Sequence, residues 1–380
     1  HQVGLTVNAP LLALSRRVRN TPYTSRIEQF PVQAYTVYNH MLLPSRFRGL
    51  EEDYWHLRKS VQIWDVACER QVQLKGPDAA KLAQMMTVRD IRKYDVGRGG
   101  LVPLCDHNGK LLNDPVVFRI AEDCYWFSIS DSDVAFWAGG LALGLGLDVE
   151  VSEIDVNPLA VQGPQAEDVV AEVFGEAVRA IKFFRFETLN FRGHPLRVSR
   201  SGWSAQGGFE ILVDDWEIGG LLYDAICVAG AKYDIGPGCP NLIERIEAGL
   251  MTYGTDITRE HTALEAGLEK YCSLDSDIDA IGIDALRAQR AQGLPQRIVG
   301  FNVGGDRVPG QRDPWPVMAN GKKVGQITSI TWSPRLEYNV ALGMVELEFA
   351  PLGTELTLVA PDAERRATIC EVPFTGASQR

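Results

Sequence analysis

The sequence lacks several features that would place it in a membrane, a secretory pathway or a metalloprotein class. No apolar run reaches the roughly 18 residues that a membrane-spanning helix needs, and the N-terminal residues show no hydrophobic region of a signal peptide. Seven cysteines are scattered over 380 residues without a C-x-x-C pair, and six histidines form no metal-binding cluster. We therefore expect a cytoplasmic protein with reduced thiols, no disulfide framework and no bound metal.

Motifs of nucleotide binding and of serine hydrolases are also missing. There is no G-x-G-x-x-G after a strand, no P-loop and no G-x-S-x-G. Acidic residues exceed basic ones by 49 to 38, so the net charge of −11 argues against a nucleic-acid partner. The chain has the composition of an ordinary globular protein, with 45% hydrophobic and 23% charged residues, and is long enough for two or three lobes.

Residues 197–213, RVSRSGWSAQGGFEILV, are the most informative stretch. Apolar and β-branched residues at both ends predict two short strands. The glycines between them allow a sharp bend and the close approach of a ligand. Glu210 then has a fixed position beside this loop, where Trp203 and Gln206 offer an apolar wall and an amide. The residues alone leave open a plain hairpin whose glutamate faces solvent.

The segment SRSGWSAQGGFEI resembles S-R-T-G-Y-T-G-E-x-G-F-E-[IV] of the glycine-cleavage T-protein (aminomethyltransferase) family, which binds tetrahydrofolate. In that family the glutamate of G-F-E grips the pterin, a role that falls here on Glu210. A carboxylate can accept the ring N–H and the exocyclic amine of a pterin in parallel, as a charged bidentate pair. The resemblance therefore implies a folate site that includes Glu210, Trp203 and Gln206.

Residues 101–120, LVPLCDHNGKLLNDPVVFRI, form a second such segment. Its Asn-Gly dipeptide between two apolar runs predicts a hairpin. The resemblance to Y-x-x-x-x-N-x-x-G-G-x-x-D-D-L-x-V places Asp114 at the reacting end of folate, as the catalytic residue, with Val116 in the same folate pocket. Leu101 replaces a tyrosine that often lines that pocket. Without the resemblance, an Asn-Asp pair before a proline reads as a plain turn.

Other segments follow the family in order. YTVYNHMLLP resembles F-x-G-W-x-M-P and places Tyr38 and Met41 near the substrate chamber. The helix expected within residues 239–253 resembles G-x-x-A-R-D-x-L-R-x-E-A-G, which makes Arg245 a folate-binding residue. Glu247 lies two residues further on, on a different face, so we expect each to have its own partner. Trp332, expected at the tip of a late turn, is assigned to the donor site and to a contact with another lobe.

The resemblance implies an α+β fold of three lobes, two mixed α/β lobes and a C-terminal antiparallel β-barrel. Residues 29–272 are expected to form the folate-binding domain from two interleaved lobes, and residues 273–380 the barrel with a helical connector. Residues 1–28 form a basic N-terminal arm. Its arginines are either solvated, or meet an anionic folate tail or a neighbouring subunit, the last of which predicts a homodimer.

Within the family, RRVRNTPYTSR, VYNHMLLP and IGPGCPNLIERIEAGL resemble the dimethylsulfoniopropionate demethylases. This implies a tetrahydrofolate-dependent methyltransferase that gives 5-methyltetrahydrofolate and methylmercaptopropionate. A sulfonium is already an activated methyl donor, so in-line positioning against N5 is the main requirement. Aromatic faces attract such a cation, and Tyr38, Trp203 and Trp332 are the candidates.

Two positions leave the donor open. Ala205 and Leu212 stand where the demethylase pattern S-K-Q-G-G-[FY]-E-I-Y has Lys and Tyr. Another sulfonium, a quaternary ammonium or a methyl ether therefore remains an alternative donor. Aminomethyl transfer from a lipoyl carrier protein, as in glycine cleavage, is the other alternative.

Overall fold

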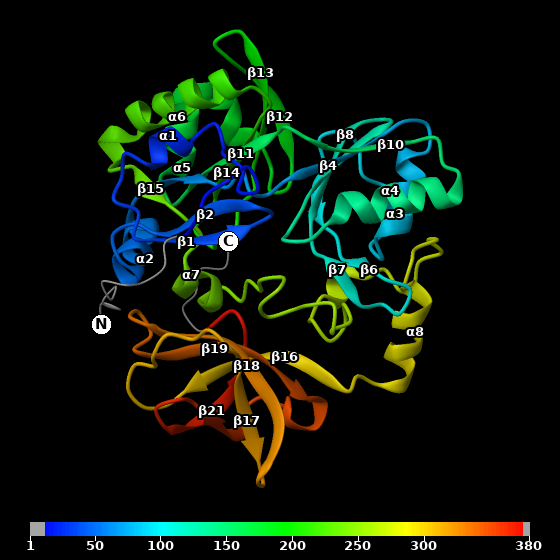
Figure 1. The fold of residues 1–380 in the computed structure, drawn as a ribbon, viewed down its shortest axis with the longest axis vertical. Coiled ribbons are helices and arrows are strands. Elements are labelled where there is room, and N and C mark those ends of the chain that lie inside the picture. Colours follow the sequence, from blue (N-terminus) through cyan, green and yellow to red (C-terminus); the bar gives the residue numbers. More distant parts are fainter. Residues whose placement is uncertain (1–11, 375–380) are drawn as a thin grey trace.

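The structure is a computed structural model, and it describes residues 12–374. Its strands form a six-stranded sheet, a five-stranded sheet, a closed barrel and two hairpins. Figure 1 shows three lobes, one around each large sheet and one formed by the barrel beneath them. The three-lobed α+β fold expected from the sequence is therefore confirmed.

The first lobe is built on the six-stranded sheet, with α5 (Ala166–Phe174) and α6 (Trp216–Gly230) packed against it. Only β15 and β3 run parallel; the other neighbouring strands are antiparallel. The strand order is β12 (Phe186–Phe191), β13 (His194–Ser199), β14 (Gly208–Val213), β11 (Asn157–Gln162), β3 (Gln62–Asp65) and β15 (Gly236–Gly238). Every residue of β11 is buried, as expected of a central strand covered on both faces.

The N-terminal arm packs onto this lobe. Tyr23, just before α1 (Thr24–Ile27), is fully buried in the core. Arg26 forms an ion pair with Asp224 at 2.7 Å, and Arg19 pairs with a carboxylate of the second lobe. The arm is therefore packed against the fold around residues 21–27, whereas residues 12–17, which include Arg16 and Arg17, are exposed. Residues 1–11 lie outside the described residues.

The second lobe holds the five-stranded antiparallel sheet, one face of which is covered by α3 (Ala79–Met86) and α4 (Val134–Leu145). Its strand order is β10 (Glu150–Ile154), β4 (Gln71–Lys75), β9 (Cys124–Ser128), β8 (Val116–Ala121) and β5 (Gly99–Leu101). The chain enters this lobe after β3 and leaves it before β11, so the two lobes are interleaved. Asp78 precedes α3, a position that favours an N-cap, but its carboxylate accepts from the Asp148 N–H instead of capping the helix.

Shorter elements connect the lobes. The predicted Asn-Gly hairpin is present between β6 (Leu104–Cys105) and β7 (Leu111–Asn113). The hairpin of β1 (Ala34–Tyr38) and β2 (Met41–Arg46) precedes α2 (Leu50–Lys59). The helix expected within residues 239–253 is only α7 (Leu242–Glu247), because the chain turns at Gly249, whose φ is 70°.

The C-terminal domain is a closed antiparallel barrel, reached through α8 (Ile283–Gln292). Its order is β16 (Gln296–Val303), β19 (Tyr338–Glu346), β18 (Lys322–Ser333), β17 (Trp315–Ala319), β20 (Glu355–Val359) and β21 (Glu364–Cys370). Phe301, Val317 and Leu358 are among the buried residues that fill it. Between residues 12 and 374, no helix combines the length and the apolar character needed to cross a membrane.

Candidate active site

Glu210 is the third residue of β14 and lies opposite Ser199 of β13. Ser201 Oγ donates to Glu210 Oε2 at 2.5 Å, and the hydroxyls of Ser199 and Ser201 are 2.9 Å apart. Glu210 Oε1 accepts no hydrogen bond from the residues that the structure describes. Burial raises the pKa of Glu210, although the side chain keeps some accessible surface. Glu210 is thus an enclosed carboxylate with free acceptor capacity, and it does not face bulk water.

The loop before Glu210 is shaped by its glycines. A side chain on Gly208, whose φ is 150°, would lie 2.1 Å from the Val161 carbonyl oxygen of the neighbouring strand. One on Gly202 would lie within 2.4 Å of the Gln162 amide. These positions accept only glycine because the loop folds tightly back onto β11.

Asp114 follows β7 and is held by a short network. Ser130 Oγ donates to Asp114 Oδ1 at 2.5 Å. The Asn113 side chain fixes the Ser130 backbone: its Nδ2 donates to the Ser130 carbonyl oxygen, and its Oδ1 accepts from the Ser130 N–H, each at 2.9 Å. Burial raises the pKa of Asp114 to about 6, so this carboxylate titrates close to neutral pH and could exchange a proton there.

Tyr38, at the end of β1, belongs to the same cluster. Burial raises its pKa well above the usual value, and the negative charges of Glu69 and Asp114 add to that rise. A hydrogen bond with Ser130 opposes the shift. Tyr253 also lies near Asp114, whose charge together with burial raises the tyrosine pKa to about 12. Two predicted residues, Tyr38 and Asp114, therefore share one region of the protein.

Glu69 is a member of the cluster that our reading of the sequence missed. It lies between β3 and β4, where the chain crosses from the first lobe to the second. Burial, and then the negative charge of Glu210, raises its pKa well above the usual value. Its only signal in the sequence is the charged pair Glu69-Arg70 after the apolar segment VAC, which does not reveal that Glu69 lies near Glu210. Among residues 12–374, no group of His, Cys, Asp and Glu side chains is arranged to hold a metal ion.

The two other predicted residues of the glycine loop differ in their surroundings. Gln206 Nε2 donates to Glu244 Oε1 at 2.8 Å, and the Ala205 N–H donates to the same oxygen at 3.1 Å. One N–H of the Gln206 amide therefore fastens the loop to α7, and the rest of the amide stays a predicted contact with folate. Trp203 is half-buried in this loop, and Val116 is half-buried at the start of β8.

Arg245 has a structural role in place of the predicted contact with folate. It forms an ion pair with Asp256 at 2.8 Å and donates to Ser329 Oγ of the barrel at 2.6 Å. Glu247 faces another way and binds Arg335 at 2.7 Å. The two side chains have separate partners, as predicted, and both fasten α7 to its neighbours, which include the barrel.

Met41 and Trp332 also differ from the prediction. Met41 is only 2% exposed and packs in the core of the first lobe, which limits its contact with a substrate. Trp332 lies within β18, before the turn and not at its tip. The Arg307 guanidinium lies 5.2 Å from the centre of its ring and pairs with Glu51 of α2, so Trp332 reaches the first lobe through that arginine.

A separate cavity of about 860 Å³ lies beneath the N-terminal arm. Arg19, Met41, Asp65 and Glu153 are among the residues that line it. None of the clustered residues Tyr38, Glu69, Asp114 and Glu210 lines this cavity. Several of its charged groups have partners within the protein: Glu153 pairs with Arg19 and Arg70, and Asp65 accepts from Thr21. The cluster of carboxylates, not this cavity, is therefore the candidate active site.

Comparisons with known proteins agree with this architecture. The family model of the GCVT N-terminal domain matches residues 25–276, and that of the glycine cleavage T-protein C-terminal barrel domain matches residues 296–375. The chain is 48% identical over 357 residues to dimethylsulfoniopropionate demethylase DmdA of Ruegeria pomeroyi, covering 94% of this chain and 97% of that protein. It is 29% identical over 339 residues to an aminomethyltransferase of Bacillus cereus, covering 87% and 91%.

A solved structure shows the same fold. The aminomethyltransferase T of the glycine cleavage system from Bartonella henselae superposes with a TM-score of 0.85 at 21% identity, covering 95% of this chain and 99% of that one. The two family models together span both the interleaved lobes and the barrel. The chain belongs to the glycine cleavage T-protein family.

Proposed function

We propose that this protein is a tetrahydrofolate-dependent methyltransferase that takes a methyl group from dimethylsulfoniopropionate and gives 5-methyltetrahydrofolate and methylmercaptopropionate. The observation that carries the proposal is the 48% identity to a dimethylsulfoniopropionate demethylase along nearly the whole of both chains. The aminomethyltransferase relative is only 29% identical. The clustered carboxylates add support, because their arrangement suits both a pterin and a cationic donor.

The residues around Glu210 fit the amino edge of a pterin. An ionised carboxylate offers about four lone-pair directions, and only Ser201 occupies one of them among the described residues. The remaining capacity on Oε1 and Oε2 can accept the ring N–H and the exocyclic amine together. Burial raises the pKa of Glu210, and binding two donors would favour its ionised form again.

The chemistry asks little of the protein beyond positioning. When bound, tetrahydrofolate supplies N5, whose lone pair accepts the methyl group. The electrons of the broken carbon–sulfur bond stay on sulfur, so the leaving group is a neutral thioether that no residue needs to protonate. The N5 proton then needs an acceptor. Asp114 Oδ2 has no hydrogen-bond donor among the described residues and can hold that proton.

A product assay tests the proposal. The purified protein is incubated with tetrahydrofolate and dimethylsulfoniopropionate, and both products are measured by mass. We expect 5-methyltetrahydrofolate and methylmercaptopropionate in equal amounts. A panel of other sulfonium, quaternary ammonium and methyl ether donors then ranks the alternatives that Ala205 and Leu212 leave open.

The same experiment separates this function from glycine cleavage. An aminomethyltransferase would form methylenetetrahydrofolate from an aminomethyl-lipoyl carrier protein and would leave the sulfonium intact. Methylenetetrahydrofolate from the carrier, with no methyl product from any panel member, would overturn the proposal.

A cytoplasmic location and a homodimer are part of the proposal. All seven cysteines are free in the structure, which suits a reducing compartment. Cell fractionation and light scattering of the purified protein are the corresponding measurements.

A further inference from the structure

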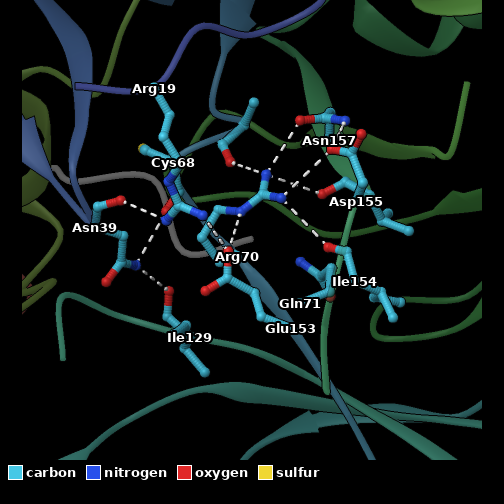
Figure 2. Close-up of polar contacts among 12 residues, drawn as sticks. Arg19, Asn39, Cys68, Arg70, Gln71, Ile129, Glu153, Ile154, Asp155 and Asn157 are labelled. Atoms are coloured by element: carbon cyan, nitrogen blue, oxygen red, sulfur yellow. Dashed lines mark hydrogen bonds and ion pairs between the residues drawn. The ribbon is translucent and has the colours of Figure 1, made fainter. Parts of the chain in front are cut away.

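The chain around Glu69 is held rigidly, as Figure 2 shows for the residues on either side of it. Asn39 Nδ2 donates to the Cys68 carbonyl oxygen at 3.0 Å. Gln71 Nε2 donates to the Glu69 carbonyl oxygen at 2.9 Å. The backbone on both sides of Glu69 therefore has fixed hydrogen-bond partners, and the direction in which its side chain leaves the chain is set by the fold.

Arg70 completes this support without neutralising Glu69. Its guanidinium is only 5% exposed and donates to Asn157 Oδ1 at 3.1 Å and to Glu153 at 3.0 Å (Figure 2). It also donates to the Ala67 carbonyl oxygen at 3.0 Å. The guanidinium of Arg70 is thus occupied by contacts with β10, with β11 and with the segment between β3 and β4.

The Glu69 carboxylate has no hydrogen-bond or ion-pair partner anywhere in residues 12–374. Other half-buried or buried carboxylates here are paired, such as Glu153 and Glu244 with arginines. Burial disfavours the ionised form of this half-buried side chain, so carrying the charge there costs folding free energy. The protein keeps Glu69 at a rigid position near Glu210 in spite of this cost. Such an arrangement is expected when a bound ligand supplies the missing partner of the carboxylate.

We infer that Glu69 is the anionic residue that receives the positively charged sulfur of the methyl donor, beside the folate-binding Glu210. The inference deepens the proposed function and rests on it. A sulfonium has no N–H or O–H to donate, so only negative charge and aromatic faces can recognise it. Tyr38 supplies the aromatic ring. It precedes Asn39, whose Nδ2 donates to the carbonyl oxygen of Cys68, next to Glu69, at 3.0 Å and to that of Ser130 at 3.2 Å.

This position also accounts for product release. The carbon–sulfur bond breaks, its electron pair stays on sulfur, and the positive charge moves to N5 before the proton departs. The thioether product is neutral at sulfur, so its attraction to Glu69 is lost. Because Glu69 acts on the charge present in the ground state, its removal should raise the KM for the donor more than it lowers kcat.

Donor binding should also be linked to proton release. Burial and the negative charge of Glu210 raise the pKa of Glu69, and a bound cation favours the ionised form and lowers that pKa again. The KM for the donor should therefore fall as pH rises. The other titratable groups that face this region are Tyr38, Cys68, Asp114, Asp131 and Glu210.

The test compares Glu69→Gln, which removes the charge and keeps the shape, with Glu348→Gln at an exposed site on the barrel. For Glu69→Gln we expect the KM for dimethylsulfoniopropionate to rise by about 10- to 100-fold. Inhibition by methylmercaptopropionate and the dissociation constant of tetrahydrofolate should stay within about threefold. The fall of KM with pH should flatten, and Glu348→Gln should match the wild type.

Three results would overturn the inference: an unchanged KM, an equal loss of affinity for the cationic donor and the neutral thioether, or an unaltered pH dependence. If Glu69→Gln does not fold, Glu69→Asp serves, since it keeps the charge and should retain the preference for the cation. A wild-type protein that transfers no methyl group from a sulfonium removes the proposed function. Calorimetry with the sulfonium and the thioether would still decide whether Glu69 binds the charge.

Discussion

At the scale of single residues, the site is defined by three carboxylates whose environments differ. Glu210 has a serine donor and free lone pairs, Asp114 is fixed by Ser130, and Glu69 has no partner among the described residues. Burial raises the pKa of each. Groups that share a region but differ in hydrogen bonding can take different roles, here folate binding, proton transfer and recognition of the donor charge.

Replacement of Glu210 by alanine should weaken folate binding. Loss of a charged bidentate pair costs on the order of 2–4 kcal/mol, and β14 keeps its register because the backbone pairing with β13 and β11 does not involve the side chain. The dissociation constant of tetrahydrofolate, measured by calorimetry, reports the loss. An unchanged dissociation constant would remove Glu210 from the folate site.

Replacement of Asp114 by asparagine should affect turnover more than binding. Loss of a proton acceptor lowers turnover by about a hundredfold, whereas folate affinity should change little, because the amide can still accept from Ser130. Wild-type turnover should rise with pH around 6, where Asp114 ionises, and the variant should lose that rise. Steady-state kinetics across pH, with the exposed Asp123→Asn as control, check both expectations. Equal turnover in wild type and variant would reduce Asp114 to a turn residue.

At the scale of elements, α7 is the joint between the first lobe and the barrel. It is only six residues long, yet three of its side chains form ion pairs: Glu244 with Arg58, Arg245 with Asp256 and Glu247 with Arg335. Glu247 accepts from Tyr54 of α2 and from Ser333 and Arg335 at the end of the β18–β19 hairpin. Glu244, on the same helix, fixes the glycine loop beside Glu210. One short helix thus links the barrel to the loop of the candidate site.

Replacement of Arg245 by alanine should destabilise the fold rather than abolish folate binding. The change leaves Asp256, which is 0% exposed, without its cation, at a cost of about 3–5 kcal/mol. Chemical denaturation measures this. Arg290→Ala, which breaks an exposed pair with Asp275, is the matched control, with little or no loss of stability expected. If the Arg245→Ala variant had normal stability but bound folate more weakly, Arg245 would belong to the folate site, as the sequence suggests.

At the scale of the whole molecule, the sequence predicted architecture better than contacts. The glycine loop, the Asn-Gly hairpin and the barrel strands carry local signals, since glycine and alternating apolar residues constrain the backbone near themselves. The contacts of Gln206 with Glu244 and of Arg245 with Asp256 have no local signal, because only folding brings these partners close. Glu69 was missed for the same reason, because its neighbour Glu210 is 141 positions away in the sequence.

The pH dependence of stability follows from the same carboxylates. Burial raises the pKa of Asp65 and of Asp114 to about 6. An acid whose pKa is raised in the folded protein leaves the free energy of unfolding unchanged below its unfolded pKa near 4. Above that pH it lowers the free energy of unfolding, until the pH has passed the folded pKa. Each therefore removes on the order of 2–3 kcal/mol from the free energy of unfolding between pH 4 and 7. Carboxylates paired with arginine, such as Asp95, whose pKa falls to about 2, act oppositely and lose their contribution below pH 4.

The free protein should therefore be most stable in weakly acidic solution and less stable at pH 8. Saturating tetrahydrofolate should reverse part of that loss, because the donors of a bound pterin favour the ionised form of Glu210 and lower its pKa in the complex. The rise in Tm on adding folate should be larger at pH 8 than at pH 5.5, measured by calorimetry with the same concentration of folate at both pH values. Glu210→Ala should lose this difference, whereas a rise in Tm that is the same at both pH values would show that folate does not bind through an enclosed carboxylate.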